Sequence, residues 1–340
     1  MSSKKQLLLG IDLGTSRTAV VSSAGDKFMI DSVVGYPRDL VGLKLLGSLY
    51  AVGQDAMKNH SFLDLVYPLE DGVLRVVSSD DAHPDAASHL FSYIVERINS
   101  DGYDEVCAVI GAPARASEED KARIQALGNE HFDLAVIVSE PFMVAYGQDI
   151  LVNAIVVDIG AGTIDLCALR GAKPAAHEQV TLVGAGDHID HKLVDLIQEK
   201  FPGVQVNKFI ARGIKEQHGF VGEANGALVK VSLRINGIPE MLDITEVVRE
   251  ACESIIPGII ESVELLMNQF PPEDQSDVLA NIVVAGGGSK IQGLDLTIAE
   301  GLKSYGDVRV TCVGDPAFSG CEGALQLGQL LPTKLWNQLG

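Results

Sequence analysis

A glycine turn between two apolar stretches, AIVVDIGAGTIDLCALRG, combines residue types that could hold a phosphate together with a metal ion. Gly160 and Gly162 lack side chains, so the backbone N–H groups around them can converge on an anion. Thr163 adds a hydroxyl, while Asp158 and Asp165 add carboxylates that could hold a cation beside that anion. The pattern predicts a strand, a phosphate-binding turn and a second strand.

The same pattern occurs near the N-terminus, in LLLGIDLGTSRTAVVSS, where Asp12 is followed by Gly14, Thr15 and Ser16. Either hairpin alone could be an ordinary glycine turn capped by its aspartate. Two matching hairpins in the two halves of the chain instead indicate a duplicated domain, each copy carrying a phosphate-binding turn.

A third glycine loop lies in IVVAGGGSKIQGL and reads as a strand, three glycines, a serine and a helix. Gly287 and Gly288 would let a flat group approach the backbone, and Ser289 would begin the helix. A helix N-terminus offers unbonded N–H groups and the positive end of a dipole. We expect an adenine base or its ribose at this loop.

Glu140, in VSEPF, follows a predicted strand over residues 134–139 and precedes Pro141, which suits the first position of a helix. A carboxylate at a strand end could orient or deprotonate a water for in-line attack on a terminal phosphate. The alternative is that Glu140 only caps the helix. Asp12 and Asp158 are candidate Mg²⁺ ligands, acting through waters because Mg²⁺ loses its water reluctantly.

Two further groups of polar residues have weaker patterns. His188 and His191 lie three residues apart and could form a metal-binding helix face. No third ligand is evident, so a solvated helix start is favoured. Lys215 and Glu216 could form a surface ion pair or reach a ribose hydroxyl.

Other phosphate-binding motifs are excluded. The chain contains no Gly-Lys pair and therefore no Walker A loop. The G-x-G-x-x-G pattern fails because Asp165 stands at the third glycine position and a strand follows in place of a helix. The Lys and H-R-D motifs of protein kinases are absent.

Composition narrows the class of protein. The chain has 340 residues, with 46% hydrophobic and 5% aromatic residues, which suits aliphatic α/β layers. The net charge of −20 disfavours binding to nucleic acid or to anionic lipid. No apolar run is long enough to span a membrane, so we expect no membrane insertion. Five dispersed cysteines and the lack of a signal peptide favour a reducing cytoplasm.

Periodicity and turn residues predict the elements that position these motifs. We expect a meander of strands over 7–12, 18–23 and 27–34, further strands over 105–111, 134–139 and 281–285, and a hairpin over 227–244 that turns at Asn236-Gly237. Ser117 should cap one helix through Asp120. Other helices are expected over 84–99, 187–201, 206–218, 245–270 with an interruption at Pro257, 291–305 and 318–328.

Taken in order, GIDLGTSRTAV, VSEPFMVAYG, VDIGAGTIDL, GAGDHIDHKLV, KEQHGFV and VVAGGGSKIQG resemble the actin, heat-shock-chaperone and sugar-kinase ATPase superfamily over essentially the whole chain. Stretches such as SVVGYPRDLVGLKLLG and CAVIGAPARAS are similar to the magnetosome-associated bacterial actins of magnetotactic bacteria. The resemblance implies an α/β fold of duplicated actin-like (ribonuclease H-like) domains, each with a large and a small subdomain. ATP and Mg²⁺ would then bind in the cleft between the domains.

The resemblance also implies subdomain boundaries and site residues. The subdomains would be 1–34 with 76–153 and 322–340; 35–75; 154–188 with 262–321; and 189–261. The nucleotide-binding residues would be Asp12, Gly14, Thr15, Ser16, Asp158, Gly160, Ala161, Gly162, Thr163, Gly186, Asp187, Lys215, Glu216, Gly287, Gly288 and Ser289, with Glu140 assigned to hydrolysis. Arg17 departs from the usual pattern and could contact a phosphate or face solvent.

The function implied is a cytoplasmic filament of many copies of the chain, assembled on binding ATP and disassembled after hydrolysis, that organises magnetosomes. Magnetosome-associated proteins are the candidate partners. A cell-shape or plasmid-segregation actin is the nearest alternative. A small-molecule kinase would need a sugar pocket, of which the sequence carries no signature. A chaperone-type ATPase would need a substrate-binding domain, which we do not expect after residue 340.

Overall fold

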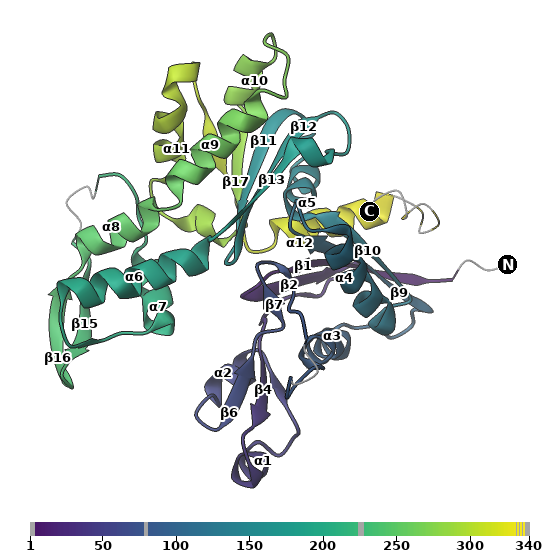
Figure 1. Cartoon of the computed structure of the whole chain (residues 1–340). Coiled ribbons are helices and arrows are strands. Elements are labelled where there is room, and N and C mark those ends of the chain that lie inside the picture. Colours follow the sequence, from purple (N-terminus) through teal and green to yellow (C-terminus); the bar gives the residue numbers. More distant parts are fainter. Residues whose placement is uncertain are drawn as a thin grey trace. The chain divides into compact units, whose positions relative to one another are not determined.

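A computed structural model describes residues 4–77, 81–223 and 228–330 together with residues 332, 334 and 336 (Figure 1). Ala227, the first residue of the predicted hairpin region, lies outside the described residues. The chain divides into two compact units. Unit 1 comprises Met1–Ile150 and Ala317–Gly340, and unit 2 comprises Leu151–Pro316. The finer division of each unit into a large and a small subdomain remains a prediction.

Unit 1 is built on a five-stranded sheet with the order β10-β9-β1-β2-β3. Its strands are β1 (Gln6–Leu13), β2 (Arg17–Ser22), β3 (Lys27–Asp31), β9 (Glu105–Ala112) and β10 (Leu134–Ser139). The first three form an antiparallel meander, and β9 and β10 run parallel to β1. The predicted strands are therefore confirmed, except that the third ends at Asp31. The chain bends directly after Asp31, where the Val33 N–H donates to the Asp31 carbonyl over 2.8 Å.

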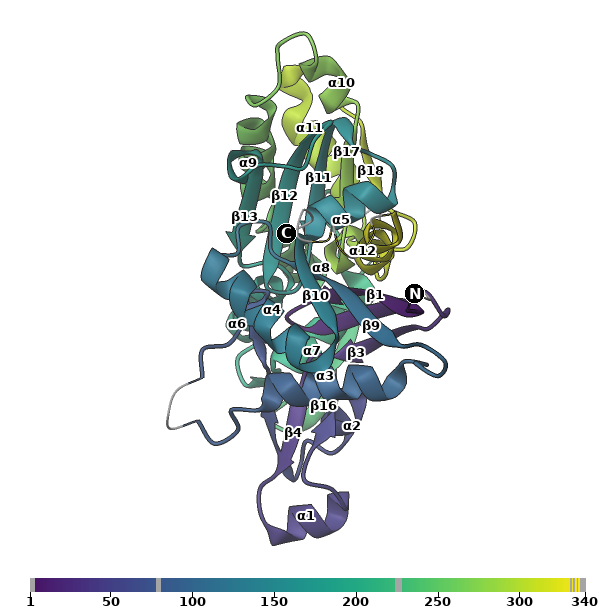
Figure 2. The same cartoon turned by 90° about the vertical axis from the view of Figure 1, so that its right-hand side faces the viewer.

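Unit 2 repeats this sheet with the order β18-β17-β11-β12-β13 (Figure 2). Its strands are β11 (Val152–Ile159), β12 (Thr163–Arg170), β13 (Gln179–Val183), β17 (Ile282–Ala285) and β18 (Val310–Cys312). Again the first three are antiparallel and the last two run parallel to the first. Strand order and direction match those of unit 1, so the duplication indicated by the two hairpins is confirmed.

Helices cover the sheet of unit 1. They are α3 (Ala86–Arg97), α4 (Glu118–His131), α5 (Glu140–Gly147) and α12 (Ser319–Leu330). The Ser117 hydroxyl accepts a hydrogen bond from the Asp120 N–H, as predicted. Leu90 and Ile124, from α3 and α4, join one core cluster with the strands. The opposite side contains Cys321 of α12 packed against β2.

Residues 34–77 of unit 1 form a small sheet with helices of its own. The elements are β4 (Val34–Pro37), α1 (Leu40–Leu46), β5 (Ala51–Val52), α2 (Gln54–Lys58), β6 (Leu63–Val66), β7 (Leu69–Glu70) and β8 (Val73–Leu74). Strands β5, β4 and β6 are hydrogen-bonded in that order. A separate core cluster, centred on Ala51, Ala56 and Leu63, lies beneath them. The segment therefore has a small core of its own, while its Val34, Tyr36 and Val52 join the core of the large sheet.

Unit 2 carries the remaining elements. These are α6 (Gly186–Lys200), α7 (Lys208–His218), α8 (Thr245–Glu253), α9 (Ile256–Met267), α10 (Gln275–Leu279), α11 (Leu294–Leu302), a small sheet of β14 (Val204–Gln205), β15 (Lys230–Ile235) and β16 (Ile238–Asp243), and the 3₁₀ turns η1 (Ala176–Glu178), η2 (Gly287–Lys290) and η3 (Lys303–Tyr305). The turn between β15 and β16 has positive φ at Asn236 (50°) and Gly237 (87°), as the Asn-Gly pair predicted.

Two helix predictions for unit 2 were wrong in their bounds. The interruption expected at Pro257 in the helix over 245–270 is confirmed, because α8 ends at Glu253 and Pro257 takes an early position in α9, but α9 ends at Met267 rather than at residue 270. The helix expected from Ile291 begins only at Leu294, because Gly293 has a φ of 78° and cannot continue a right-handed helix. Within the described residues, no helix combines the length and apolar character that crossing a membrane requires.

Candidate functional site

The parallel strands of unit 1 end at one edge of the sheet, and two predicted site residues lie there. Asp12 is the second-last residue of β1, and Glu140 is the first residue of α5, directly after β10. Between them lies Gly111 of β9, where a Cβ would stand 3.1 Å from the Glu140 Cγ. The Met143 Cε would be nearer still, at 2.5 Å, so the glycine makes room for the side chains of both Glu140 and Met143. The sequence separates Asp12 and Glu140 widely, but the sheet brings both to one edge.

The first glycine hairpin is held from two sides. A Cβ at Gly14 would stand 2.5 Å from the Arg17 carbonyl oxygen, so this position needs glycine. The Ser32 hydroxyl donates to the Gly14 carbonyl over 2.7 Å. On the other side, the Thr15 hydroxyl accepts the Gly72 N–H over 2.7 Å. These bonds fix the conformation of the turn.

Charged neighbours surround the same hairpin. Arg17, for which two roles were considered, is half exposed and pairs with Asp31 on the adjacent strand, with 3.7 Å between Nε and Oδ1. Such a long, exposed pair contributes little stability. Asp12 is partly buried, and a Cβ at Gly320, near the start of α12, would stand 3.1 Å from its Oδ2. The lack of a side chain at Gly320 thus leaves space for the Asp12 carboxylate.

In the second hairpin the two aspartates differ in their surroundings. Asp158 and Asp165 are directly opposite each other on β11 and β12, and both are buried. Directly opposite side chains lie on the same face of a sheet. The Thr181 hydroxyl donates to Asp165 Oδ1 over 2.5 Å, which binds Asp165 into the sheet. Asp158 is at the end of β11, beside the turn that the Gly160 N–H closes on the Thr163 carbonyl. Of the two, Asp158 is the better candidate ligand.

The start of α6 is attached to this hairpin through backbone hydrogen bonds. Consecutive N–H groups donate to the hairpin carbonyls: Gly184 and Ala185 to Gly162, Gly186 to Gly160, and Asp187 to Ala161, over 2.7–3.3 Å. The first amides of α6 therefore bond to the hairpin. The positive end of the helix dipole lies directly behind the turn, where it favours a bound anion.

The third glycine loop packs on the end of β11. Gly286 has a φ of 72°, and a Cβ there would overlap the Asp158 carboxylate. A Cβ at Gly288 would overlap the Ile159 side chain. By contrast, a Cβ at Gly287 would meet no atom within 4 Å, so this glycine faces open space. The loop thus combines tight packing against β11 with one accessible backbone position.

The helix predicted at this loop was wrong. Gly287–Lys290 forms the 3₁₀ turn η2, and the Ser289 hydroxyl donates to the Gly286 carbonyl within it over 2.8 Å. Helix α11 begins only after Gly293. A short 3₁₀ turn lacks the aligned peptide dipoles of an α-helix, so an anion-binding helix end is not available at these glycines.

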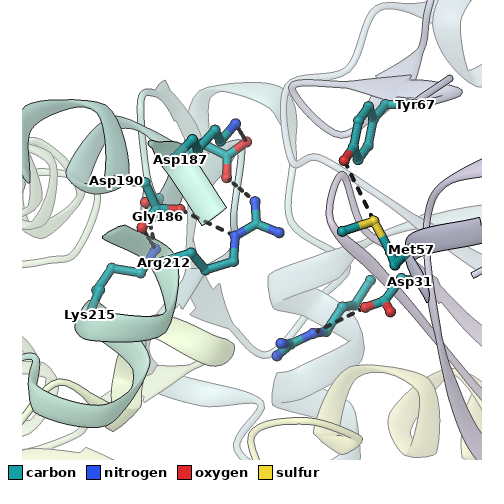
Figure 3. Close-up of polar contacts among 10 residues, drawn as sticks. Asp31, Met57, Tyr67, Gly186, Asp187, Asp190, Arg212 and Lys215 are labelled. Atoms are coloured by element: carbon teal, nitrogen blue, oxygen red, sulfur yellow. Dashed lines mark hydrogen bonds and ion pairs between the residues drawn. The ribbon is translucent and has the colours of Figure 1, made fainter. Parts of the chain in front are cut away.

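A network of five charged side chains joins α6 to α7 (Figure 3). Its members are Asp187 and Asp190 on α6 and Lys208, Arg212 and Lys215 on α7. Asp187 pairs with Lys208 over 2.8 Å and with Arg212 over 2.9 Å. Asp190 is fully buried and pairs with Lys215 over 2.6 Å and with Arg212 over 3.3 Å. Burial raises the pKa of Asp190, and the two cations oppose this shift.

The network corrects one interpretation of α7. Lys215 does not form the surface ion pair with Glu216 that was one of the two interpretations. Its side chain is only 13% exposed and pairs with Asp190. Glu216 is exposed. His188 and His191 are also exposed, as a solvated helix start predicts. No cluster of three or more His, Cys, Asp or Glu that could hold a metal occurs in the part of the chain that the structure describes.

Sequence reasoning missed several residues that support the site. Thr181, Lys208 and Arg212 belong to this set, as does Gly72. For α7 a signal was present, because Lys208, Arg212 and Lys215 follow the spacing i, i+4, i+7 of one helix face. For the Thr181 and Gly72 bonds, no local pattern indicates the partner.

The two repeated sheets and their matching hairpins define an actin-like protein. The model of the family described as MreB/Mbl protein matches residues 6–332. The chain belongs to this family of bacterial actin-like proteins, so the resemblance seen in the motifs is confirmed.

Within the family, the chain is similar to the actin-like protein MamK. It is 50% identical to MamK of Paramagnetospirillum magneticum over 337 residues, covering 99% of this chain and 96% of the relative. It is also 50% identical to MamK of Magnetospirillum gryphiswaldense, covering 99% and 93%. The cell shape-determining protein MreB of Escherichia coli is 25% identical over 313 residues, covering 86% of each chain.

Solved structures agree with this relationship. A MamK double helical filament has a TM-score of 0.92 at 50% identity, covering 96% of this chain and all of that one. A non-polymerising MamK mutant bound to AMPPNP has a TM-score of 0.74 with the same identity and coverage. MreB 5 of Spiroplasma citri, at 22% identity and a TM-score of 0.81, shares the fold.

Proposed function

We propose that this protein binds Mg-ATP, hydrolyses it and assembles into cytoplasmic filaments that organise magnetosomes. The observation that carries the proposal is the 50% identity to MamK, which forms double helical filaments. The repeated sheet, with a phosphate-type hairpin after its first strand in each unit, agrees with it. The AMPPNP bound to a MamK mutant supports a nucleotide as the ligand.

The phosphates would be bound by the two hairpins and the nucleoside by the glycine loop and α7. The proposed phosphate contacts are Asp12, Gly14, Thr15, Ser16, Asp158, Gly160, Ala161, Gly162 and Thr163, with Gly186 and Asp187 beside them; those to the nucleoside are Glu216, Gly287, Gly288 and Ser289. The accessible backbone at Gly287 supports the nucleoside role.

Asp12 and Asp158 would hold the Mg²⁺ ion. Each is a carboxylate at a strand end next to a glycine turn, where a hydrated cation bridged to phosphate fits better than a cage of protein ligands. Bound Mg²⁺ would neutralise charge on the phosphate oxygens. Glu140, at the same sheet edge as Asp12, would orient or deprotonate the attacking water.

Replacement of Asp158 by alanine is expected to weaken Mg-ATP binding about 10–100-fold, because the magnesium shell loses a carboxylate. Calorimetric titration with ATP in Mg²⁺ and in EDTA measures the effect, and the loss should be confined to Mg²⁺. Asp195→Ala, which removes an exposed carboxylate from α6, is the matched control. Tight binding by Asp158→Ala in Mg²⁺ would show that Asp158 is not a metal ligand.

The exposed apolar residues on and after α1 support a filament contact. This α1 patch consists of Leu40, Val41, Leu45 and Leu49, which are 63–83% exposed. Exposed apolar patches usually mark interaction sites. A filament requires a contact between different surfaces of successive copies, so that assembly does not close. We infer that residues 34–77 of one subunit meet the base of the next through this patch.

High-speed pelleting with Mg-ATP, Mg-ADP and no nucleotide tests assembly. The proposal expects the protein in the pellet with Mg-ATP. If it stays in solution under every nucleotide and salt condition, the filament proposal fails, and phosphate release should then be measured with candidate sugars to test a kinase.

The family also includes cell-shape-determining relatives, which makes a cell-shape actin the second candidate. Expression in a magnetotactic cell that lacks MamK separates the two. Restored magnetosome chains would support the proposed role, and restored cell shape in a strain lacking MreB would support the alternative.

A further inference from the structure

Lys215 is held between two acceptors at the start of α6. Its Nζ lies 2.6 Å from the Gly186 carbonyl oxygen and 2.6 Å from Asp190 Oδ1. The lysine side chain is 13% exposed and that of Asp190 is 0% exposed. An ammonium fixed by one short hydrogen bond and one short ion pair at a largely buried position is poorly placed to form a new contact with a ribose. Figure 3 shows its side chain directed from α7 towards α6.

The carbonyl that Lys215 contacts belongs to the same peptide group as the Asp187 N–H. That N–H donates over 2.7 Å to the carbonyl of Ala161, between the two glycines of the second hairpin. Donation to the carbonyl of a peptide polarises its N–H and strengthens the bond that the N–H makes. An ion pair and two short hydrogen bonds therefore link Asp190 through Lys215 and the Gly186–Asp187 peptide to Ala161.

The geometry at Gly186 keeps this path short. A Cβ there would stand 3.2 Å from Lys215 Nζ and 3.2 Å from the Gly160 carbonyl oxygen. Glycine at this position lets the ammonium and the hairpin approach the same peptide from two sides. The Gly186 N–H donates to the Gly160 carbonyl, so the hairpin is bonded at adjacent residues.

We propose that Lys215, held by Asp190, is a positioning residue for the second phosphate hairpin: it favours phosphate binding by fixing the Gly186–Asp187 peptide on Ala161, and it makes no contact with the nucleoside. The role rests on the nucleotide binding proposed above. It revises the contact that family resemblance implies for Lys215 and leaves that contact to the exposed Glu216.

Lys215→Met tests the role, because methionine keeps the apolar stem and removes the ammonium. Asp190 retains Arg212 as a charge partner in this variant, which helps the fold to survive. Lys200→Met is the control: Lys200 is an exposed lysine at the C-terminal end of α6, and its ammonium donates to the Asp243 carbonyl. Asp190→Asn is a second variant that removes the support of Lys215 while leaving the lysine in place.

Two measurements on the full chain are compared. Competition against a labelled ATP analogue gives affinities for Mg-ATP, Mg-ADP and adenosine. Hydrogen exchange without nucleotide gives the protection of the amides of residues 184–187, which bond to the hairpin. Lys215→Met and Asp190→Asn should bind ATP and ADP about tenfold more weakly, keep the wild-type affinity for adenosine and lose protection at these amides. Lys200→Met should change neither.

The outcomes separate this inference from the proposed function. An equal loss for adenosine and ATP in Lys215→Met would overturn the inference and indicate a direct nucleoside contact. Unchanged ATP affinity and unchanged protection in both variants would also overturn it. If the wild-type chain binds no nucleotide, the proposed function fails, while hydrogen exchange still reports whether Lys215 holds the hairpin.

Discussion

Glu140→Ala is expected to lower the rate of ATP hydrolysis by about 10²–10⁴-fold, the usual contribution of a positioned general base. The side chain stands at the end of β10, against Gly111, at the same sheet edge as Asp12. The substitution removes the carboxylate but leaves the backbone N–H groups that would donate hydrogen bonds to the phosphates. ATP binding and ATP-driven assembly should therefore persist, and the filaments should fail to disassemble.

Phosphate release and pelleting over time measure this result together. Glu140→Gln separates the two roles considered for the carboxylate, because an amide can orient a water but cannot take its proton. Glu130→Ala, on the exposed side of α4, serves as the control and should hydrolyse ATP normally. If Glu140→Ala releases phosphate at the wild-type rate, Glu140 does not take part in ATP hydrolysis.

Leu45→Asp should prevent assembly without loss of ATP binding. The Leu45 side chain is 63% exposed, so the charge has little effect on the fold of the isolated subunit. In a filament that buries the α1 patch, the new carboxylate would lose its hydration and gain no hydrogen bond or opposite charge in return, which is energetically costly. A central interface residue typically contributes about 2 kcal/mol or more, so the critical concentration should rise about 30-fold or more.

Pelleting across a range of protein concentrations gives the critical concentration, and titration of the soluble variant gives its ATP affinity. Leu45→Met keeps an apolar side chain of similar size and should assemble like the wild type. If Leu45→Asp pellets with Mg-ATP at the wild-type concentration, the α1 patch is not part of the filament contact.

The sequence by itself determined those features that depend on neighbouring residues. The glycine hairpins, the Asn236-Gly237 turn and the Ser117 cap follow from short-range steric limits and local hydrogen bonds. Because one hairpin pattern occurs twice, the duplicated sheet could also be predicted. The same local reasoning put Glu140 at the start of a helix after a strand, as the structure has it.

Errors arose where a local pattern has more than one solution. The apolar run after the third glycine loop fits a helix, yet Gly293 delays that helix and leaves a 3₁₀ turn beside the glycines. The run from Lys27 to Val34 fits one strand, yet the strand ends at Asp31, where the chain bends and the Val33 N–H donates to the Asp31 carbonyl. Each outcome depends on a backbone conformation or a partner that periodicity does not encode.

Only the tertiary structure decided which distant groups meet. Lys215 is bonded to Gly186 and Asp190, not to its neighbour on the surface, and Asp165 is bonded to Thr181. These contacts depend on how α6 docks against α7 and on the register of β12 with β13. Helix spacing and strand alternation specify which face a side chain occupies, but the partner on that face is set by packing of the whole unit.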